Sequence, residues 1–342
     1  MINGYSRLLE KTKAKRIPFS ALLELTYKCN LKCRHCYVVD EPQRQELSFE
    51  KICSILDELA RAGCLYLVFT GGEILTRSDF FDIAFYAGKK GFALRLFTNG
   101  TLITPKAADK IKQICPASVE MSLYAKKAPL HDAVTGVKGS YEKTTRVFKL
   151  LKERGINTVM KSVLMKDTLG EFEGLKDFAA ELGCRFVYDV SIVPRNDGCK
   201  KPQSCAVGQR ELKKFLLRQV KIPEQGPLPI PLDSALCNAG VNTVSVSAYG
   251  EVFACMAIRK PCGDLNKELF SDIWYKSPAL SEIRSARFSD LSQCRQCRFL
   301  NYCDRCSGVA FLEAGDFLGA SKSACQKAAA LKECVEELQG VC

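Results

Sequence analysis

Short apolar runs alternate with amphipathic segments along the first half of the chain. Runs rich in β-branched and aromatic residues predict six strands, at Ser20–Thr26, Tyr66–Thr70, Ala93–Thr98, Ser118–Tyr124, Thr158–Leu164 and Arg185–Ile192. Helical periodicity predicts five helices between them, at Ser48–Ala62, Ser78–Lys90, Pro105–Ile114, Ser140–Arg154 and Gly170–Leu182. Because strands that alternate with helices are joined by right-handed crossovers, we expect a parallel sheet.

The number of strand–helix units limits the fold. Six units are too few for a closed eight-stranded barrel, so an open partial barrel or a doubly wound sheet fits the pattern. In either fold, functional residues gather at the carboxyl ends of the strands. Four of the predicted helices are directly followed by a glycine that suits a left-handed C-cap, namely Gly63, Gly91, Gly155 and Gly183.

The second half of the chain has a different character. Pro194 to Asp233 contains six prolines around one predicted helix, Gln209–Val220, and we interpret it as a bridge between domains. Beyond it, Cys237 to Cys342 shows little periodicity apart from a predicted hairpin, Thr243–Ser247 with Glu251–Cys255. We therefore expect bound metal to stabilise this cysteine-rich part.

Sulfur is the unusual feature of the composition. The chain has 19 cysteines, and its N-terminal residues lack the apolar region of a signal peptide. A cytoplasmic location is therefore expected, where disulfides are disfavoured and metal-bound thiolates are the leading explanation for so many cysteines. His35 and His131 are the two histidines, which argues against histidine-rich metal chemistry. His131 is expected in a loop, without a chemical role.

Charge and hydropathy exclude two classes of partner. The formal net charge is +12, but lysine and arginine are spread along predicted helices beside acidic residues and do not form a basic stripe. No nucleic-acid partner is therefore expected. No run of apolar residues is long enough to span a bilayer, so no membrane association is expected either.

The first chemical motif is Cys29-x3-Cys33-x2-Cys36, directly after the first predicted strand. Three thiolates on one short loop can hold three irons of a cubane cluster and leave the fourth iron open to a ligand, because no fourth cysteine lies nearby. The alternative is a zinc loop completed by His35, although the spacing differs from the usual zinc knuckle.

A second motif, Gly71-Gly72-Glu73, follows the second strand. Glycines there allow the backbone to approach a small ligand, and a carboxylate there can accept a hydrogen bond from an ammonium group. Taken alone, this motif could be a plain turn.

Together with Thr98–Thr101 (TNGT) and Met121–Tyr124 (MSLY), these motifs resemble the radical S-adenosylmethionine (AdoMet) superfamily. The resemblance implies a partial (β/α)6 TIM-like barrel in which Cys29, Cys33 and Cys36 hold a 4Fe–4S cluster. The open iron of that cluster would bind AdoMet, and one-electron reduction would yield a 5′-deoxyadenosyl radical that abstracts hydrogen from the substrate. Ile74 stands where the family commonly has proline.

The same resemblance assigns side chains to AdoMet. Gly71, Gly72 and Glu73 would hold its methionyl amine, and Ser122 would contact its ribose or carboxylate. Lys161 would pair with its carboxylate, and His35 occupies the position of an aromatic residue near the adenine. The alternatives are that Ser122 and Lys161 are polar residues capping the barrel interior and that His35 is a solvated loop residue.

The C-terminal cysteines resemble the SPASM extension of radical AdoMet enzymes, which binds two auxiliary 4Fe–4S clusters. The resemblance gives the outer cluster to Cys294, Cys297, Cys303 and Cys325, and the inner cluster to Cys237, Cys255 and Cys306. The fourth inner ligand is left open between a vacant iron, a substrate thiolate and Cys262. The implied division is an N-terminal extension (1–18), a barrel (19–195), a bridging segment (196–234) and a SPASM domain (235–342).

By resemblance, the chain is an enzyme that matures a peptide or protein side chain by a thioether or carbon–carbon crosslink, an epimerisation or an oxidation. The expected partners are the peptide or protein substrate and a reductase such as flavodoxin or ferredoxin. A leader peptide would be recognised either by the barrel edge or by a separate leader-peptide-binding protein. The alternatives are a tetrapyrrole or haem-pathway enzyme, an anaerobic sulfatase-maturing enzyme and an iron–sulfur electron-transfer protein. Met256 argues against the sulfatase-maturing enzyme, because that family has an aspartate at this position.

Overall fold

The computed structural model describes residues 4–219 and 230–338. Nine strands form one sheet in the order β6-β5-β4-β3-β2-β1-β7-β8-β9. The six strands that form the barrel wall are all parallel, and they are β1 (Ser20–Thr26), β2 (Tyr66–Gly71), β3 (Ala93–Thr98), β4 (Ser118–Ser122), β5 (Thr158–Val163) and β6 (Arg185–Asp189). The predicted parallel sheet and the partial barrel are confirmed.

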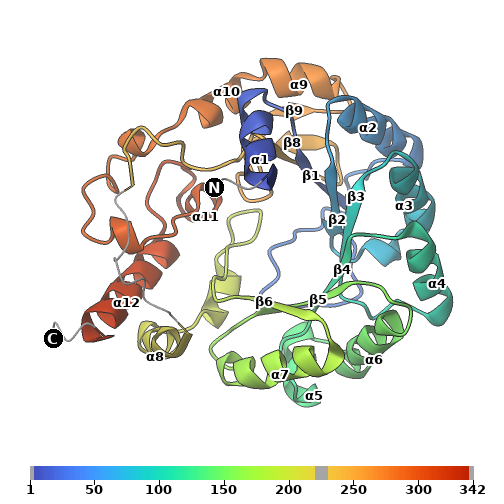
Figure 1. Ribbon diagram of the computed structural model, residues 1–342, viewed down its shortest axis with the longest axis horizontal. Coiled ribbons are helices and arrows are strands. Elements are labelled where there is room, and N and C mark those ends of the chain that lie inside the picture. Colours follow the sequence, from blue (N-terminus) through green and yellow to red (C-terminus); the bar gives the residue numbers. More distant parts are fainter. Residues whose placement is uncertain (1–3, 220–229, 339–342) are drawn as a thin grey trace.

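Helices cover the outer side of this curved wall (Figure 1). The five predicted crossover helices are α2 (Phe49–Arg61), α3 (Phe80–Lys89), α4 (Pro105–Ile114), α6 (Ser140–Lys152) and α7 (Phe172–Leu182). Ser48 is the N-cap of α2 and accepts a hydrogen bond from the Lys51 backbone, and the four glycines predicted as C-caps all have positive φ. Alternate strand residues such as Leu23 and Phe69 pack under these helices, so the other residues face the inside of the barrel.

The C-terminal region extends the same sheet. The hairpin strands β7 (Thr243–Val246) and β8 (Glu251–Phe253) lie where the sequence predicts them, and β9 (Gly263–Asp264) follows. β7 pairs in parallel with β1, with Leu23 opposite Val246, whereas β8 and β9 pair antiparallel. The barrel wall and the cysteine-rich part therefore share backbone hydrogen bonds.

The expectation that the C-terminal region has little secondary structure is wrong. It contains α9 (Phe270–Lys276), α10 (Pro278–Ser285), α11 (Ser307–Ala314) and α12 (Lys322–Leu338). Phe270 and Trp274 are fully buried in the main core, and the Trp274 indole donates a 2.6 Å hydrogen bond to the Arg16 carbonyl just after α1 (Gly4–Ala14). The short helices α9 and α10 are stabilised by the core that the barrel strands supply, which local periodicity does not reveal.

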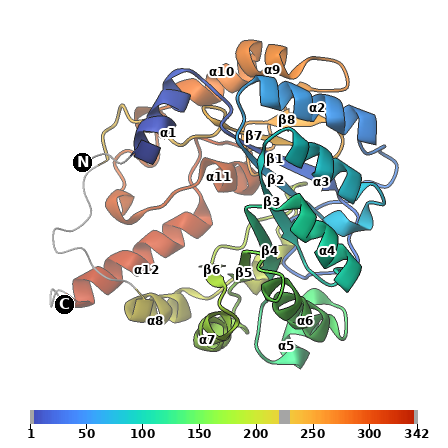
Figure 2. The same cartoon turned by 45° about the vertical axis from the view of Figure 1, so that its right-hand side comes forward.

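The bridging segment also carries a helix. The prediction of Gln209–Val220 matches α8 (Gln209–Gln219), while Val220 lies outside the described residues. Lys213 on α8 forms ion pairs with Glu333 and Glu337 on α12, and the two helices lie side by side in both views (Figures 1 and 2). The segment thus joins the end of the barrel to the end of the chain.

Candidate active site

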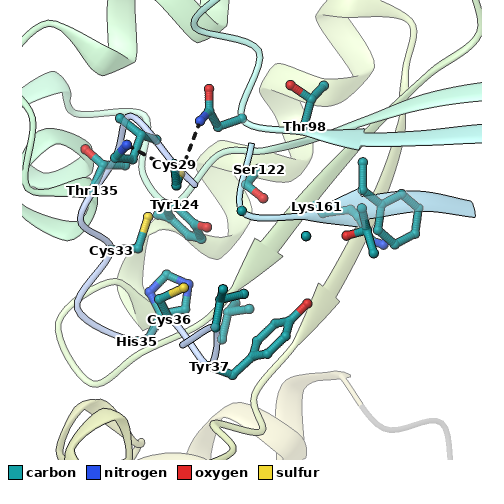
Figure 3. Close-up of a pocket in the computed structure, with 18 of the residues that line it drawn as sticks. Cys29, Cys33, His35, Cys36, Tyr37, Thr98, Ser122, Tyr124, Thr135 and Lys161 are labelled. Carbon is teal, nitrogen blue, oxygen red and sulfur yellow. Dashed lines mark hydrogen bonds between the residues drawn. The ribbon is translucent and has the colours of Figure 1, made fainter. Parts of the chain in front are cut away.

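The cysteine loop after β1 lies at the carboxyl ends of the barrel strands. Cys29, Cys33 and Cys36 all line one cavity of about 610 Å³ (Figure 3). The loop is held by backbone hydrogen bonds from Lys32 to the Thr135 carbonyl (2.8 Å) and from Arg34 to the Val134 carbonyl (3.1 Å). The structure thus brings the three predicted ligands together on one rigidly supported loop.

The element that supports this loop is α5 (Ala128–Thr135), which the sequence did not predict. His131 lies in this helix and is buried, so its expected place in a loop is wrong. Its Nδ1 accepts a hydrogen bond from the Tyr124 backbone at 3.2 Å, and its ring stacks on Tyr124 with centroids 5.6 Å apart. His131 therefore lines the cavity and positions Tyr124, a role that its sequence context did not signal.

Burial suppresses ionisation of the loop thiols in the metal-free protein. It raises the pKa of Cys33 to about 12, with the neighbouring Cys36 and Cys29 adding to the shift. The pKa values of Cys29 and Cys36 are raised as well, again mainly by burial. Iron binding must therefore displace protons, and its positive charge would compensate the three buried thiolates. A cubane cluster fits this donor set because every donor is a thiol at the edge of one cavity.

His35 lines the same cavity. Its ring meets Tyr124 edge-on, with centroids 4.7 Å apart. Burial, with a smaller contribution from Arg34, lowers the pKa of His35 to about 4, so the ring is neutral at pH 7. A neutral half-buried ring beside Tyr124 suits the predicted packing near an adenine. Tyr124 itself was not singled out as a site residue, although its position just after β4 is a signal that could have identified it.

Gly71 and Gly72 occupy a crowded position beside the cysteine loop. A Cβ on Gly71 would lie 2.1 Å from the Thr26 carbonyl oxygen, and one on Gly72 would lie 2.3 Å from that of Lys28. Gly71 also has φ of +131°. Both residues line the cavity, and glycine is required here because the strand end and the cysteine loop lie in direct contact.

Glu73 is fully buried, and backbone and side-chain donors surround its carboxylate. Oε1 accepts from the Thr98 hydroxyl at 2.6 Å, and Oε2 accepts from the Asn99 backbone at 2.7 Å. Burial nonetheless raises its pKa. In this arrangement Glu73 fixes the TNGT turn after β3. The neighbouring Gly71–Gly72 backbone is the part of the motif that faces the cavity.

Ser122 and Lys161 lie opposite each other on β4 and β5 and both line the cavity. The Lys161 ammonium pairs with Glu120 at 2.9 Å and lies 3.5 Å from the centroid of the Phe97 ring. Burial lowers the pKa of Lys161, whereas Glu120 opposes that shift. The ammonium thus lies on the inner wall of the barrel within the cavity that Figure 3 shows.

Burial raises the pKa of Cys237 and raises that of Cys255 to about 11, and the neighbouring Cys306 adds to both shifts. Burial also raises the pKa of Cys303 to about 11 and that of Cys325, and the neighbouring Cys294 adds to both shifts. The assignment of these cysteines to two clusters stays a prediction. Cys262 is buried in the main core, and its thiol donates to the Lys260 carbonyl.

Comparison with protein families identifies the architecture. A model of the radical SAM superfamily matches residues 23–179, and a model of the SPASM iron–sulfur cluster-binding domain matches residues 237–298. The chain belongs to the radical SAM superfamily. It is a radical SAM enzyme with a SPASM domain, whose cofactors are a 4Fe–4S cluster and AdoMet, with further iron–sulfur binding implied by the SPASM region.

Relatives of this radical SAM enzyme act on different substrates. An AdoMet-dependent heme synthase from Oleidesulfovibrio alaskensis is 25% identical over 86% of this chain and 84% of its own length. The antilisterial bacteriocin subtilosin biosynthesis protein AlbA from Bacillus subtilis is 28% identical over 85% of this chain and 67% of its own length. Streptococcus suis SuiB, solved with its precursor peptide SuiA, has the same fold, with a TM-score of 0.72, 18% identity, and coverage of 94% of this chain and 80% of SuiB.

None of the helices in the described part of the radical SAM enzyme is long and apolar enough to cross a membrane.

Proposed function

We propose that this radical SAM enzyme abstracts a hydrogen atom from a residue of a peptide or protein and so matures that side chain. The observation that carries the proposal is the shape of the site. A cavity of about 610 Å³ is the size that one drug-sized ligand such as AdoMet occupies, so the substrate must enter from the rim. Ser191, Ile192 and Val193, just after the edge strand β6, line the cavity on that side. An extended chain can reach the cavity along this edge.

The residues of the site have separate tasks. Cys29, Cys33 and Cys36 hold the cluster, which supplies a carbon-centred radical by reductive cleavage of AdoMet. The Gly71–Gly72 backbone binds the methionyl amine, with Glu73 fixing the adjoining turn. The side chains that orient the rest of AdoMet are His35 at the adenine, Ser122 at the ribose or carboxylate, and Lys161 at the carboxylate.

Two auxiliary 4Fe–4S clusters belong to the proposal. Cys294, Cys297, Cys303 and Cys325 hold the outer cluster, and Cys237, Cys255 and Cys306 hold the inner one. A substrate thiolate or Cys262 completes the inner set, unless its fourth iron stays open. Electrons for AdoMet cleavage come from flavodoxin or ferredoxin, and a separate protein presents the leader peptide in the cytoplasm.

Two relatives favour different substrates for the proposed reaction. AlbA takes part in bacteriocin biosynthesis, which supports a peptide, whereas the heme synthase supports a tetrapyrrole. A tetrapyrrole is a rigid disc that would need room beside AdoMet in the same cavity. The sulfatase-maturing alternative lacks a base, because Met256 lines the cavity and has no proton-accepting group.

The test uses the reconstituted enzyme with AdoMet and dithionite. Synthetic peptides encoded by short reading frames beside the gene are incubated in parallel with iron coproporphyrin III, and products are analysed by mass spectrometry. We expect a mass change of one peptide, or deuterium uptake from heavy water on epimerisation, together with 5′-deoxyadenosine. Modification of the porphyrin with every peptide unchanged would overturn the proposal.

A further inference from the structure

A ring of hydrogen bonds joins the cysteine loop to the turn that follows β3. The side-chain amide of Asn30, next to Cys29, donates to the Thr101 hydroxyl at 2.8 Å, and this hydroxyl donates to Asn99 Oδ1 at 2.6 Å. Asn99 Nδ2 completes the ring by donating to Asn30 Oδ1 at 2.9 Å. Three side chains from two segments that are far apart in sequence thus hold one another in place.

The backbone of Thr101 determines which way the Asn99 amide points. The Thr101 N–H can only donate, and it lies 2.8 Å from Asn99 Oδ1. Asn99 Nδ2 must therefore point away from Thr101 and toward the cysteine loop. It carries two hydrogens, and Asn30 accepts one of them, so the second is left for another acceptor.

That acceptor is the sulfur of Cys29. Asn99 Nδ2 lies 3.9 Å from Cys29 Sγ, and a dashed line at Cys29 marks this hydrogen bond in Figure 3. The Leu31 backbone donates to the same sulfur at 3.4 Å. Burial raises the pKa of Cys29, and both donors oppose this shift because they favour the thiolate. Asn99 and Cys29 line the same cavity, so the donor acts at the site itself.

A donor to a cluster ligand changes how easily the cluster accepts an electron. The cluster gains one negative charge on reduction, so a hydrogen bond to a ligand sulfur stabilises the reduced form more than the oxidised form. The reduction potential rises as a result. Because reductive cleavage of AdoMet begins with this electron, the donor widens the range of reductants that can drive the enzyme.

We propose that Asn99 is a positioning residue that acts through Cys29 and raises the reduction potential of the AdoMet-binding cluster. The inference rests on the proposed role of Cys29 as a cluster ligand and on no particular substrate. Since Asn30 and Thr101 already hold the amide in place, the donor needs no reorganisation when the electron arrives.

The test is a redox titration of the reconstituted protein, followed by electron paramagnetic resonance. The AdoMet-binding cluster is recognised by the signal that changes when AdoMet is added. Asn99→Ser removes the amide donor but leaves a hydroxyl oxygen for the Thr101 N–H. We expect the equilibrium constant for reduction to fall about fivefold, the effect of one hydrogen bond, which is about 40 mV for one electron.

A second variant distinguishes loss of the donor from a collapsed turn. Asn99→Asp keeps Oδ1 for the Thr101 N–H and hydroxyl but replaces Nδ2 by a negatively charged oxygen. The potential should therefore fall further than in Asn99→Ser, although the turn retains its acceptor. An unchanged potential in both variants overturns the inference.

Two controls separate the hydrogen bond to sulfur from other effects. Thr101→Val breaks the ring at the hydroxyl but leaves the Asn99 amide on Cys29. Asn157→Ser removes an exposed amide that donates to the Ala117 carbonyl, just before the amino ends of β4 and β5. Both should keep the wild-type potential. A fall in Thr101→Val as large as that in Asn99→Ser overturns the inference, because loosening the loop would then explain the shift.

The variant with alanine at Cys29, Cys33 and Cys36 keeps this result apart from an error in the ligand assignment. It should lose the AdoMet-responsive signal. A signal that persists would show that the loop does not hold the cluster, which overturns the proposed site and this inference together. A signal that is lost, with an unchanged potential in both Asn99 variants, overturns the role of Asn99 alone.

Discussion

Arg259 donates two hydrogen bonds to Glu24, at 2.7 and 2.9 Å, and this ion pair joins the SPASM region to the first barrel strand. Both side chains are buried, with 9% and 0% of their surfaces exposed. The Tyr27 hydroxyl donates to the same carboxylate at 2.6 Å, two residues before Cys29. Since Arg259 follows Cys255 by four residues, the contact fixes Cys255, a proposed auxiliary-cluster ligand, relative to the loop that contains Cys29.

Breaking this pair should be costly. We expect Arg259→Met to lower the free energy of unfolding by about 3–5 kcal/mol, because it leaves the buried Glu24 carboxylate without its cation. The double variant Glu24→Gln/Arg259→Met should lose less free energy of unfolding than the two single variants lose together. Denaturant unfolding of the reconstituted protein measures both effects.

The exposed pair Lys276–Asp272, at 2.6 Å, is the control for this cycle. Lys276→Ala should leave the free energy of unfolding nearly unchanged, since exposed ion pairs are solvated and screened. If Arg259→Met lowers the free energy of unfolding no more than Lys276→Ala does, the buried ion pair does not stabilise the contact between the SPASM region and the barrel.

Gly72 should not tolerate a side chain. In Gly72→Ala the new Cβ meets the carbonyl oxygens of Lys28 and Tyr27 at 2.3 and 2.7 Å, which are rigid backbone atoms. We expect a loss of stability of about 1–3 kcal/mol and weaker AdoMet binding, because the strand end and the cysteine loop must separate. Thermal unfolding and AdoMet titration measure the two effects.

Gly170→Ala is the matched control, because nothing lies within 4 Å of its added Cβ. It should leave both quantities unchanged. AdoMet affinity that is the same in Gly72→Ala and Gly170→Ala would contradict the close contact between the Gly-Gly turn and the cysteine loop.

Much of the barrel could be predicted because its signals are local. Each crossover helix has its own apolar face and each strand its own apolar run, and the cysteine spacing marks the loop directly. Helix α5 was missed because it is a single eight-residue helix whose buried residues face the cysteine loop, about a hundred residues earlier in the sequence.

The inner-wall charges could not be predicted for a related reason. Arg95, Glu120 and Lys161 are far apart in sequence, and only the register of three parallel strands brings them together. The Trp274 contact with Arg16 likewise joins two ends of the chain. Contacts of this kind depend on the assembled sheet, so a single sequence carries no pattern for them.

His131 should make stability depend on pH. Burial lowers its pKa to about 4, with Asp132 opposing the shift, so protonation favours the unfolded chain, where the pKa is about 6.5. The stabilisation that neutral His131 contributes is fully present above pH 6.5. The free energy of unfolding falls by about 3 kcal/mol as the pH drops to 4. In His131→Asn, which keeps an acceptor for Tyr124, this part of the loss should disappear.

Thermal midpoints of the two proteins between pH 7 and pH 5 measure this difference. His35 and the clusters titrate in both proteins, so they cancel in the comparison. Parallel pH profiles for wild type and His131→Asn would show that His131 is not held neutral beneath Tyr124.

Cysteine variants should distinguish the proposed AdoMet-binding cluster from the proposed auxiliary clusters, by the iron that each variant loses and by its effect on AdoMet cleavage. We expect about twelve irons in the reconstituted chain, four for each cubane. The variant with alanine at Cys29, Cys33 and Cys36 should lose about four irons and all AdoMet cleavage. The variant with alanine at Cys237, Cys255 and Cys306 should also lose about four irons, but its dithionite-driven AdoMet cleavage should remain measurable. Cys115→Ser, at an exposed helix end outside both sets, should keep every iron. Cleavage that survives loss of the three loop thiols would contradict the assignment of the AdoMet-binding cluster to this loop.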